Sequence, residues 1–205
     1  MNERHFYEPK EGHGLKHDPL NAIIAPRPIG WISTVSNDGA ANLAPYSFFN
    51  LLNYKPPIIG FSSQGRKDSV TNARTTGEFV WNLATRGLAE AMNVSSATVP
   101  ADTDEFVLAG LAKAPSKLVA SPRVAASPVQ FECRVTQIIQ LRDAADEELE
   151  QWLVLGEAIG IHIDNSLIED GTYRTASARP ITRGGGPADY FEITDDHLFH
   201  MFRPV

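Results

Sequence analysis

The sequence has one cysteine, and it contains neither a long apolar run nor a cluster of basic residues. No stretch approaches the roughly 18 to 20 apolar residues of a membrane-spanning helix, and the N-terminal segment MNERHFYEPKEGHGLKHDP is too polar for a secretory signal. The formal net charge is −7, with scattered lysines and arginines, unlike the basic face of a nucleic-acid binder. We therefore expect a cytoplasmic protein that acts on a small molecule, with no nucleic-acid or membrane partner.

The single cysteine, Cys133, cannot form an internal disulfide. It lies in VQFECRVTQI, where apolar residues alternate with polar ones as in a half-buried strand. A redox or nucleophilic thiol needs a basic neighbour or a helix N-terminus to stabilise its thiolate. We interpret Cys133 as a small core residue.

Common nucleotide and hydrolase signatures are missing as well. The sequence contains no G-x-x-x-x-G-K-[ST], no G-x-G-x-x-G between a strand and a helix, and no G-x-S-x-G. The histidine pairs His13/His17 and His197/His200 lack the neighbouring cysteines or helical glutamate of a zinc signature, so we expect no metal site. A phosphate, if one is bound, must be held in another way.

Short β-branched or aromatic runs bounded by Gly, Pro, Asn or Asp dominate the sequence. They are IGWISTVS, ANLAPYSFF, PPIIGFSS, EFVWNLA, VQFECRVTQIIQL and QWLVLGEAIGIHI. The Asp-Gly turn in SNDGAAN predicts a hairpin of Ile29–Val35 with Asn42–Phe48. The expected helices are Asp68–Thr76, Gly87–Ala97 and a turn at Asp104–Ala109. With no long linker, this pattern predicts one mainly β (α+β) domain over residues 1–205, a barrel or a sandwich.

One segment has the chemistry of a phosphate cradle. SSQGRKDSVTNARTTG follows the strand PPIIGF and carries two hydroxyls, a glycine, two cations and a helix start. The free N–H groups and positive dipole of a helix N-terminus attract phosphate, and adjacent cations add charge-assisted hydrogen bonds. The alternative is that Asp68 simply caps a surface helix beside solvated cations. The residues concerned are Ser62, Ser63, Arg66, Lys67, Asp68 and Ser69.

A second segment, NLAPYSFFN, has a proline inside a strand and aromatic residues around Ser47. Pro45 cannot donate to a β-ladder, so the stretch belongs at an edge or bulge where backbone groups are free to meet a ligand. Such an edge could line a flat aromatic ring. The alternative is that the aromatic side chains fill the core.

In APRPIGWISTVSNDGAANLAPYSFFN, PPIIGFSS, GRKDSVTNARTTGEFVWNLA and LGEAIGIHI, the sequence resembles the flavin-reductase-like family of FMN-binding split-barrel proteins. The branch concerned includes flavoredoxins and the reductase components of two-component monooxygenases such as the nitrilotriacetate system. The resemblance runs in the same order from FYEP near the N-terminus to RGGGPADYF and the closing FRP. It implies a six-stranded antiparallel Greek-key split barrel with flanking helices, and a homodimer with FMN near the subunit interface.

The resemblance also assigns residues. It implies that Ser62, Ser63, Arg66, Lys67, Asp68 and Ser69 hold the phosphate of FMN, and that Asn42, Tyr46, Ser47 and Phe48 lie along the isoalloxazine ring. It places His162, which ends the run LGEAIGIHI, at the flavin or the substrate pocket as the catalytic candidate. Further pocket residues implied are Arg27, Arg183 and Tyr190.

The sequence is compatible with two functions. The first is an NAD(P)H:FMN oxidoreductase, which supplies reduced flavin to an acceptor or a partner monooxygenase. The second is a flavoredoxin-like FMN electron carrier without a nicotinamide site. In either case the flavin carries the reaction, and the protein orients it and stabilises the charge that develops on reduction. A third hypothesis, a barrel that binds another aromatic ligand or only another protein, leaves the phosphate-side motif without a role.

Overall fold

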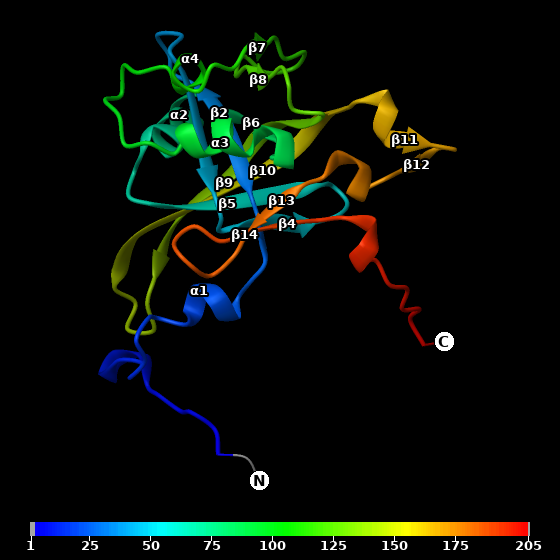
Figure 1. Ribbon diagram of the computed structural model, residues 1–205. Coiled ribbons are helices and arrows are strands. Elements are labelled where there is room, and N and C mark those ends of the chain that lie inside the picture. The colour runs from blue at the N-terminus through cyan, green and yellow to red at the C-terminus, as the bar shows by residue number, and fades with distance from the viewer. Residues whose placement is uncertain (1–2, 205) are drawn as a thin grey trace.

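The computed structural model describes residues 3–204 and is built around one strongly curled antiparallel sheet (Figure 1). Its seven strands follow the order β3-β2-β6-β9-β10-β5-β4. Their bounds are Gly30–Val35 (β2), Ala41–Tyr46 (β3), Phe49–Asn53 (β4), Ile58–Gln64 (β5), Glu78–Asn82 (β6), Val129–Arg142 (β9) and Glu148–Ile163 (β10). No helix within residues 3–204 is long and apolar enough to cross a membrane.

Helices and small sheets surround the curled sheet. The helices are α1 (Leu20–Ile23), α2 (Asp68–Thr76), α3 (Ala89–Val94) and α4 (Glu105–Leu108). Short 3₁₀ turns occupy Pro9–Glu11, Arg86–Leu88, Asn165–Leu167, Ala176–Ala178 and Asp195–His197. A three-stranded sheet joins β1 (Arg27–Pro28), β13 (Ile181–Arg183) and β14 (Tyr190–Glu192). Two-stranded pairs are β7 (Lys113–Ala114) with β8 (Arg123–Val124), and β11 (Ile168–Glu169) with β12 (Thr172–Tyr173).

The expected hairpin forms, but its second strand is shorter than predicted. β2 and β3 pair from Gly30↔Tyr46 to Val35↔Ala41. At Ser47 and Phe48 the chain leaves β2 and β4 begins, now paired with β5. This change of neighbour divides the NLAPYSFFN run into two strands, so the main sheet has seven strands where we expected six.

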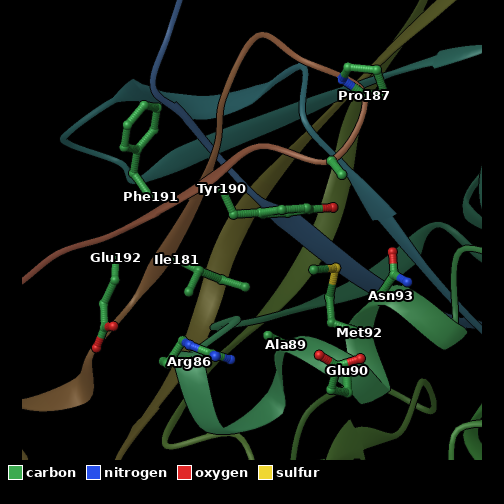
Figure 2. Close-up of a pocket in the computed structure, with 11 residues that line it drawn as sticks. Arg86, Ala89, Glu90, Met92, Asn93, Ile181, Pro187, Tyr190, Phe191 and Glu192 are labelled. Atoms are coloured by element: carbon green, nitrogen blue, oxygen red, sulfur yellow. The ribbon is translucent and has the colours of Figure 1, made fainter.

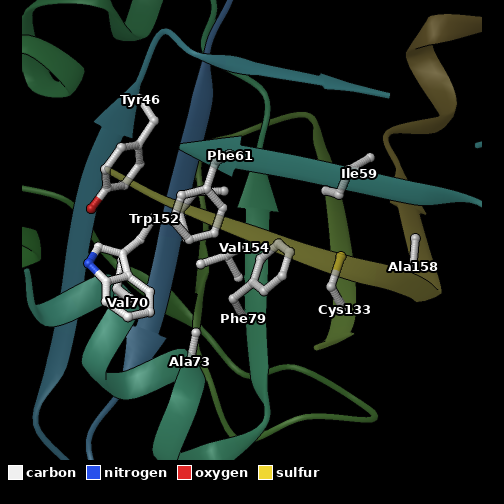
Figure 3. Packing of buried hydrophobic residues seen from close by; sticks show 11 residues of the cluster. Tyr46, Ile59, Phe61, Val70, Ala73, Phe79, Cys133, Trp152, Val154 and Ala158 are labelled. Atoms are coloured by element: carbon white, nitrogen blue, oxygen red, sulfur yellow. The ribbon is translucent and has the colours of Figure 1, made fainter. Parts of the chain in front are cut away.

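The strand β2 is buried on both faces, so it separates two hydrophobic clusters. Ile32 lies in the cluster enclosed by the curled sheet. Figure 3 shows Phe61, Phe79 and Cys133 of the same cluster. Trp31, next to Ile32, points the other way into a cluster with Met92 of α3 and Phe106 of α4, as expected from the alternation of side chains along a strand. The expected core position of Cys133 is therefore confirmed, and burial raises the pKa of its thiol.

The helix α2 is found at Asp68–Thr76 as predicted, and it ends at Gly77 with a left-handed φ of 75°, the usual glycine-ended helix. The helix expected at Gly87–Ala97 is shorter. Ser95 follows it, and its hydroxyl donates to the carbonyl of Met92 while accepting from the indole of Trp31. These bonds hold Ser95 at the helix end and free the following residues for the site described below.

The segment from Ala112 to Pro128 has little regular structure apart from the short strands β7 and β8. Two glutamates hold it. Glu78 accepts hydrogen bonds from the backbone N–H groups of Ala120 and Ser121, and the fully buried Glu132 accepts from Lys117 and Leu118 at 2.8 and 2.6 Å. The backbone N–H groups that this segment cannot pair in a ladder are thus satisfied by carboxylates.

Candidate functional site

The N-terminus of α2 faces a polar cavity of about 240 Å³, here called the β3–α2 cavity. One wall is the end of β3, and the opposite wall is the first turn of α2. The remaining wall comes from the segment after α3 and from Glu105 of α4. Its polar lining comprises Asn42, Tyr46, Lys67, Asp68, Ser69, Ser95, Ser96, Thr98 and Glu105.

The start of α2 leaves backbone donors available to this cavity. The helix begins after Lys67 and carries no side-chain cap, so the first N–H groups of the helix have no intrahelical acceptor. The alternative in which Asp68 caps the helix is wrong, because Asp68 is the first helical residue and its side chain makes no such bond. Free N–H groups and the side chain of Lys67 give this corner of the cavity donors and a positive charge, the chemistry that an anion requires.

A network of amide and hydroxyl side chains joins β3 to α2 behind this corner. The amide nitrogen of Asn42 donates to the hydroxyl of Ser69 at 2.9 Å and to that of Thr34 at 3.2 Å. Asn72 also donates to Thr34, at 3.1 Å. These contacts fix the first turn of α2 against β3, which keeps the cavity walls in place.

Tyr46 is buried between the core and this cavity. Its ring packs on Phe61 with centroids 4.8 Å apart (Figure 3). Burial raises the pKa of Tyr46, although the nearby hydroxyls of Ser69 and Ser63 act in the opposite direction. Within residues 3–204 the Tyr46 hydroxyl nonetheless makes no well-formed hydrogen bond. A buried hydroxyl without a partner costs free energy and indicates a missing acceptor or donor.

Glu105 closes the far side of the cavity. It is buried, and its Oε2 accepts a 3.0 Å hydrogen bond from the backbone N–H of Leu43. Burial raises the pKa of Glu105, with a smaller contribution from the charge of Asp68.

A second cavity, of about 390 Å³, is lined in part by the residues that follow β3 and is called the Ser47 cavity. Its lining consists of residues 24–28 and 47–50. Tyr46 lines the β3–α2 cavity and the next residue, Ser47, lines the Ser47 cavity, so consecutive residues of the chain contribute to the two cavities. The Phe48 side chain, about half exposed, lies at this second cavity with Arg27.

Arg27 connects three parts of the chain at the Ser47 cavity. The guanidinium donates to the carbonyls of Asn21, Ile24 and Gly184, the last two at 3.2 and 3.1 Å. Its carbon lies 5.8 Å from the centroid of the Phe48 ring, within reach of a cation–π contact. The Arg27 Nε is buried and lacks a hydrogen-bond partner within residues 3–204.

The structure therefore brings together most of the residues that the sequence singles out. In the β3–α2 cavity lie Asn42, Tyr46, Lys67, Asp68 and Ser69. In the Ser47 cavity lie Arg27, Ser47 and Phe48. Sequence reasoning missed Glu105 and the hydroxyl-rich segment from Ser95 to Thr98.

Three of the predicted phosphate-side residues are engaged elsewhere. Arg66 lies over the ring of Trp152 with its guanidinium carbon 4.3 Å from the centroid. The Ser62 hydroxyl accepts a 2.6 Å hydrogen bond from Gln151. The Ser63 hydroxyl donates to the carbonyl of Gly65 at 3.2 Å. Arg66 and Ser62 would have to change partners to meet a ligand in the β3–α2 cavity.

The two remaining pocket residues lie together and line neither of these two cavities. Tyr190 lines a separate cavity of about 520 Å³ with Met92 and Asn93 of α3 (Figure 2). Arg183 lies over the Tyr190 ring, 4.9 Å from its centroid. It also donates to the carbonyls of Asp189 and Pro187 at 2.6 and 2.8 Å.

His162 lies near the end of β10, where the sequence predicts it, and belongs to neither the β3–α2 cavity nor the Ser47 cavity. Its Nε2 contacts the Oε1 of Glu132 at 2.5 Å. Burial raises the pKa of Glu132, but the N–H groups of Lys117 and Leu118 and the imidazole outweigh it, so the net pKa is lowered. His162 is thus part of the contact that holds the 112–128 segment.

The curled antiparallel sheet, with one cavity at the start of α2 and another at Ser47, fits the split-barrel class of proteins. Residues 24–181 match the model of the flavin reductase like domain, and this chain belongs to that family. The expected mainly β split-barrel fold is confirmed.

Similar proteins support the assignment. An uncharacterized protein of Aquifex aeolicus is 35% identical over 170 residues, which cover 80% of this chain and 83% of that protein. The crystal structure of nitrilotriacetate monooxygenase component B from Bacillus cereus is 29% identical, with a TM-score of 0.88 over 98% of this chain and 100% of that one. A flavoredoxin of Desulfovibrio vulgaris shares the fold at 18% identity, with a TM-score of 0.75 over 86% of this chain and 91% of its own.

Proposed function

We propose that this protein binds FMN and reduces it with NAD(P)H, and that it passes the electrons to an acceptor or a partner monooxygenase. Membership of the flavin reductase like family supports a flavin, and the similarity to a protein named as a monooxygenase component supports a partner enzyme. We further propose a homodimer. The location in the cytoplasm and the organisation as one domain over residues 1–205 stay predictions.

One observation carries the proposal. Among the buried side-chain nitrogen and oxygen atoms of residues 3–204, those without a hydrogen-bond partner are the Tyr46 hydroxyl and Arg27 Nε. Tyr46 lines the β3–α2 cavity and Arg27 lines the Ser47 cavity. Native proteins rarely leave buried polar groups unpaired, so a ligand that extends through both cavities would supply the missing partners.

The chemistry of the two cavities fits the two halves of FMN. In this proposal Lys67 and the free N–H groups of α2 hold the phosphate. Because Asn42, Tyr46 and Ser69 line the same cavity as Lys67, they are proposed to bond the ribityl hydroxyls, and not the ring system or the phosphate as the resemblance implies. Ser47 and Phe48 lie along the ring system. Ser62, Ser63 and Arg66 are proposed to reach the phosphate side from the neighbouring strand and loop.

Bound FMN would supply the redox chemistry, accepting hydride from a reduced nicotinamide. The protein supplies placement and charge. Arg27, buried beside the Ser47 cavity, would stabilise negative charge that develops on the ring system, because a fixed cation in a poorly solvated site acts strongly. We propose Arg183 and Tyr190 as the outer wall for the nicotinamide or the acceptor.

His162 remains the proposed catalytic residue, and its replacement by Gln tests this role. A fall in kcat with FMN binding intact would support it. An unchanged kcat with a lowered free energy of unfolding would assign the imidazole to the Glu132 contact alone.

The experiment that tests the proposed function is the visible spectrum of the purified protein with FMN, recorded anaerobically before and after NADH and then NADPH. Bleaching of bound-flavin bands by either nucleotide supports the reductase and names its donor. Bound flavin that neither nucleotide bleaches favours the electron carrier without a nicotinamide site. A protein that does not bind FMN overturns the proposal.

A further inference from the structure

The two edges of the seven-stranded sheet are protected in different ways. At one edge, β3 carries α4 against it, and its Leu43 N–H is bonded to the buried Glu105. At the other edge lies β4, and no strand of residues 3–204 pairs with its outer side. The Leu51 N–H in β4 bonds to the side chain of the preceding Asn50 at 2.8 Å. Because no strand covers this side, the main chain of β4 is open to another strand, apart from the Leu51 N–H.

The exposed residues along this open edge include three large apolar side chains between and after Asn50 and Asn53. Leu51 and Leu52 lie in β4 and Tyr54 follows it; together they are called here the β4 surface, and they are 49%, 54% and 76% exposed. Edge strands in soluble proteins are usually blunted by charges, bulges or a covering element. A bulge between Leu51 and Asn53 and the following Lys55 and Pro56 give β4 only a partial form of this protection.

The C-terminal tail, residues 198–204, is the complementary feature. Four of its first five residues are large and apolar, and Leu198, Phe199, Met201 and Phe202 are 66%, 74%, 84% and 88% exposed. Figure 1 shows the tail leaving the body of the protein as an extended chain. Solvated chain ends are typically polar, so this composition indicates a segment that is buried on a partner.

We propose that the C-terminal tail of one copy adds to the β4 surface of a second copy, and that the two copies exchange tails reciprocally. Strand addition to an open edge combines main-chain hydrogen bonds with side-chain burial, and a reciprocal exchange closes with two-fold symmetry. The tail in the structure runs away from its own body, which makes a second copy the occupant. The inference rests on the homodimer proposed above and identifies the segment that holds it together.

The first experiment measures dimer dissociation by sedimentation velocity over a concentration series. Removal of residues 199–205 is expected to raise the dimer dissociation constant at least about 100-fold, because several large apolar side chains would lose their burial. A full-length variant with Phe199→Ser and Phe202→Ser is expected to behave likewise. The matched control, His200→Ser with Arg203→Ser, keeps the tail apolar and is expected to keep the wild-type constant.

The second experiment locates the tail. The only native thiol, Cys133, is fully buried, so introduced cysteines can be oxidised selectively. A variant with Leu52→Cys and Phe202→Cys is expected to form a disulfide-linked dimer on mild oxidation, visible on a non-reducing gel. Leu51→Cys with Phe202→Cys serves as a neighbouring pair, and each single-cysteine variant is expected to stay monomeric on the gel.

The outcomes separate this inference from the proposals on which it rests. Wild-type protein that sediments as a monomer would overturn the dimer and the tail exchange together. A wild-type dimer whose dissociation constant is unchanged by the truncation overturns only the tail exchange. An internal disulfide, seen as thiol loss without a dimer band, would show that the tail docks on its own chain and also contradicts the inference. FMN binding is recorded separately, so its absence bears only on the proposed function.

Discussion

Replacing Tyr46 by Phe should affect the free protein and its flavin complex in opposite directions. Within residues 3–204 the Tyr46 hydroxyl is buried without a hydrogen-bond partner. Burying an unsatisfied polar group costs about 1–3 kcal/mol, so Tyr46→Phe, which keeps the ring packed on Phe61, should leave the free energy of unfolding unchanged or raise it by up to about 2 kcal/mol. Removing a tyrosine hydroxyl from a protein core usually lowers the free energy of unfolding, because most buried hydroxyls are hydrogen-bonded.

The same variant should bind FMN more weakly. If the hydroxyl bonds the ligand, its loss removes a net hydrogen bond of about 0.5–1.5 kcal/mol, which corresponds to a rise in Kd of about 2- to 12-fold. The two quantities are measured by urea unfolding of the flavin-free protein and by titration of FMN fluorescence. Tyr54→Phe, at an exposed tyrosine, is the matched control and should change neither.

Two results would refute this reasoning. A loss of more than about 1 kcal/mol in the flavin-free Tyr46→Phe variant would show that the hydroxyl is already bonded, with Ser63 or Ser69 as the partner. An unchanged FMN affinity would remove Tyr46 from the ligand site. The first result would correct the hydrogen bonding of Tyr46 in the protein without FMN. The second would contradict the proposed FMN site.

Three further predictions concern the phosphate corner, the Glu132 contact and the core. Lys67→Ala should raise the Kd for FMN about tenfold or more, because a charge-assisted bond is lost; riboflavin, which lacks the phosphate, should bind as before. Glu132→Gln should lower the free energy of unfolding at pH 7 by roughly 2–4 kcal/mol, since it weakens a buried carboxylate with three hydrogen bonds. Gly156→Ala should cost about 1–3 kcal/mol or more, because the new Cβ would collide with the Phe79 ring.

The Glu132 prediction includes a pH dependence whose sign follows from the lowered pKa of this carboxyl in the folded protein. A group whose folded pKa lies below its unfolded value of about 4.3 contributes stability above that value and loses it as pH falls through the folded pKa. The difference between wild type and Glu132→Gln, measured by urea unfolding, should therefore shrink below about pH 5. A difference that stays constant from pH 7 to pH 3.5 would contradict the assignment.

Controls for the other two variants lie in the same chain. Salt should weaken FMN binding less in Lys67→Ala than in wild type, because one charge contact is gone; equal losses for FMN and riboflavin would instead indicate a folding defect. Gly87→Ala has no heavy atom within 4 Å of the added Cβ and should be close to neutral. If Gly156→Ala also left the free energy of unfolding unchanged, the Phe79 ring would have to move away from the new Cβ, which contradicts its close packing in the core.

Much of the fold could be predicted from the sequence because its signals are local. Alternation, turn residues and the Gly77 helix end gave β2, α2 and the long β9–β10 pair close to their observed bounds. The division of the NLAPYSFFN run could not be predicted, because it depends on a change of pairing partner from β2 to β5. The whole sheet determines which strands pair, so a segment of nine residues does not contain this information.

The site shows the same contrast between local and distant signals. Lys67, Asp68 and Ser69 are neighbours in sequence, so a helix start with cations could be recognised directly. Glu105 joins them from 36 residues further on, through a contact with the N–H of Leu43. The capping Asp104 marks the start of a short helix, but nothing local indicates which strand that helix covers.

The contacts of His162 depend on the register between β9 and β10. Its position near the end of a strand is clear from the sequence, yet its partner is set by the pairing of β9 with β10. That pairing places His162 opposite Gln130 and brings it within reach of Glu132. A bulge between Ala158 and Gly160 contributes to this offset, and such irregularities leave no clear pattern in composition.

The continuity of β3, Ser47 and β4 has a consequence for ligand selection. Asn42 lines one cavity and Phe48 lines the next, and the chain bends at Ser47 and Phe48 between β3 and β4. Both ends are anchored by pairing with β2 and β5, so the spacing of Asn42 and Phe48 cannot adjust by a hinge. In the proposed FMN complex, this anchoring would fix the separation between the chain segments that hold the phosphate and the ring system, with no closure of the protein around the ligand.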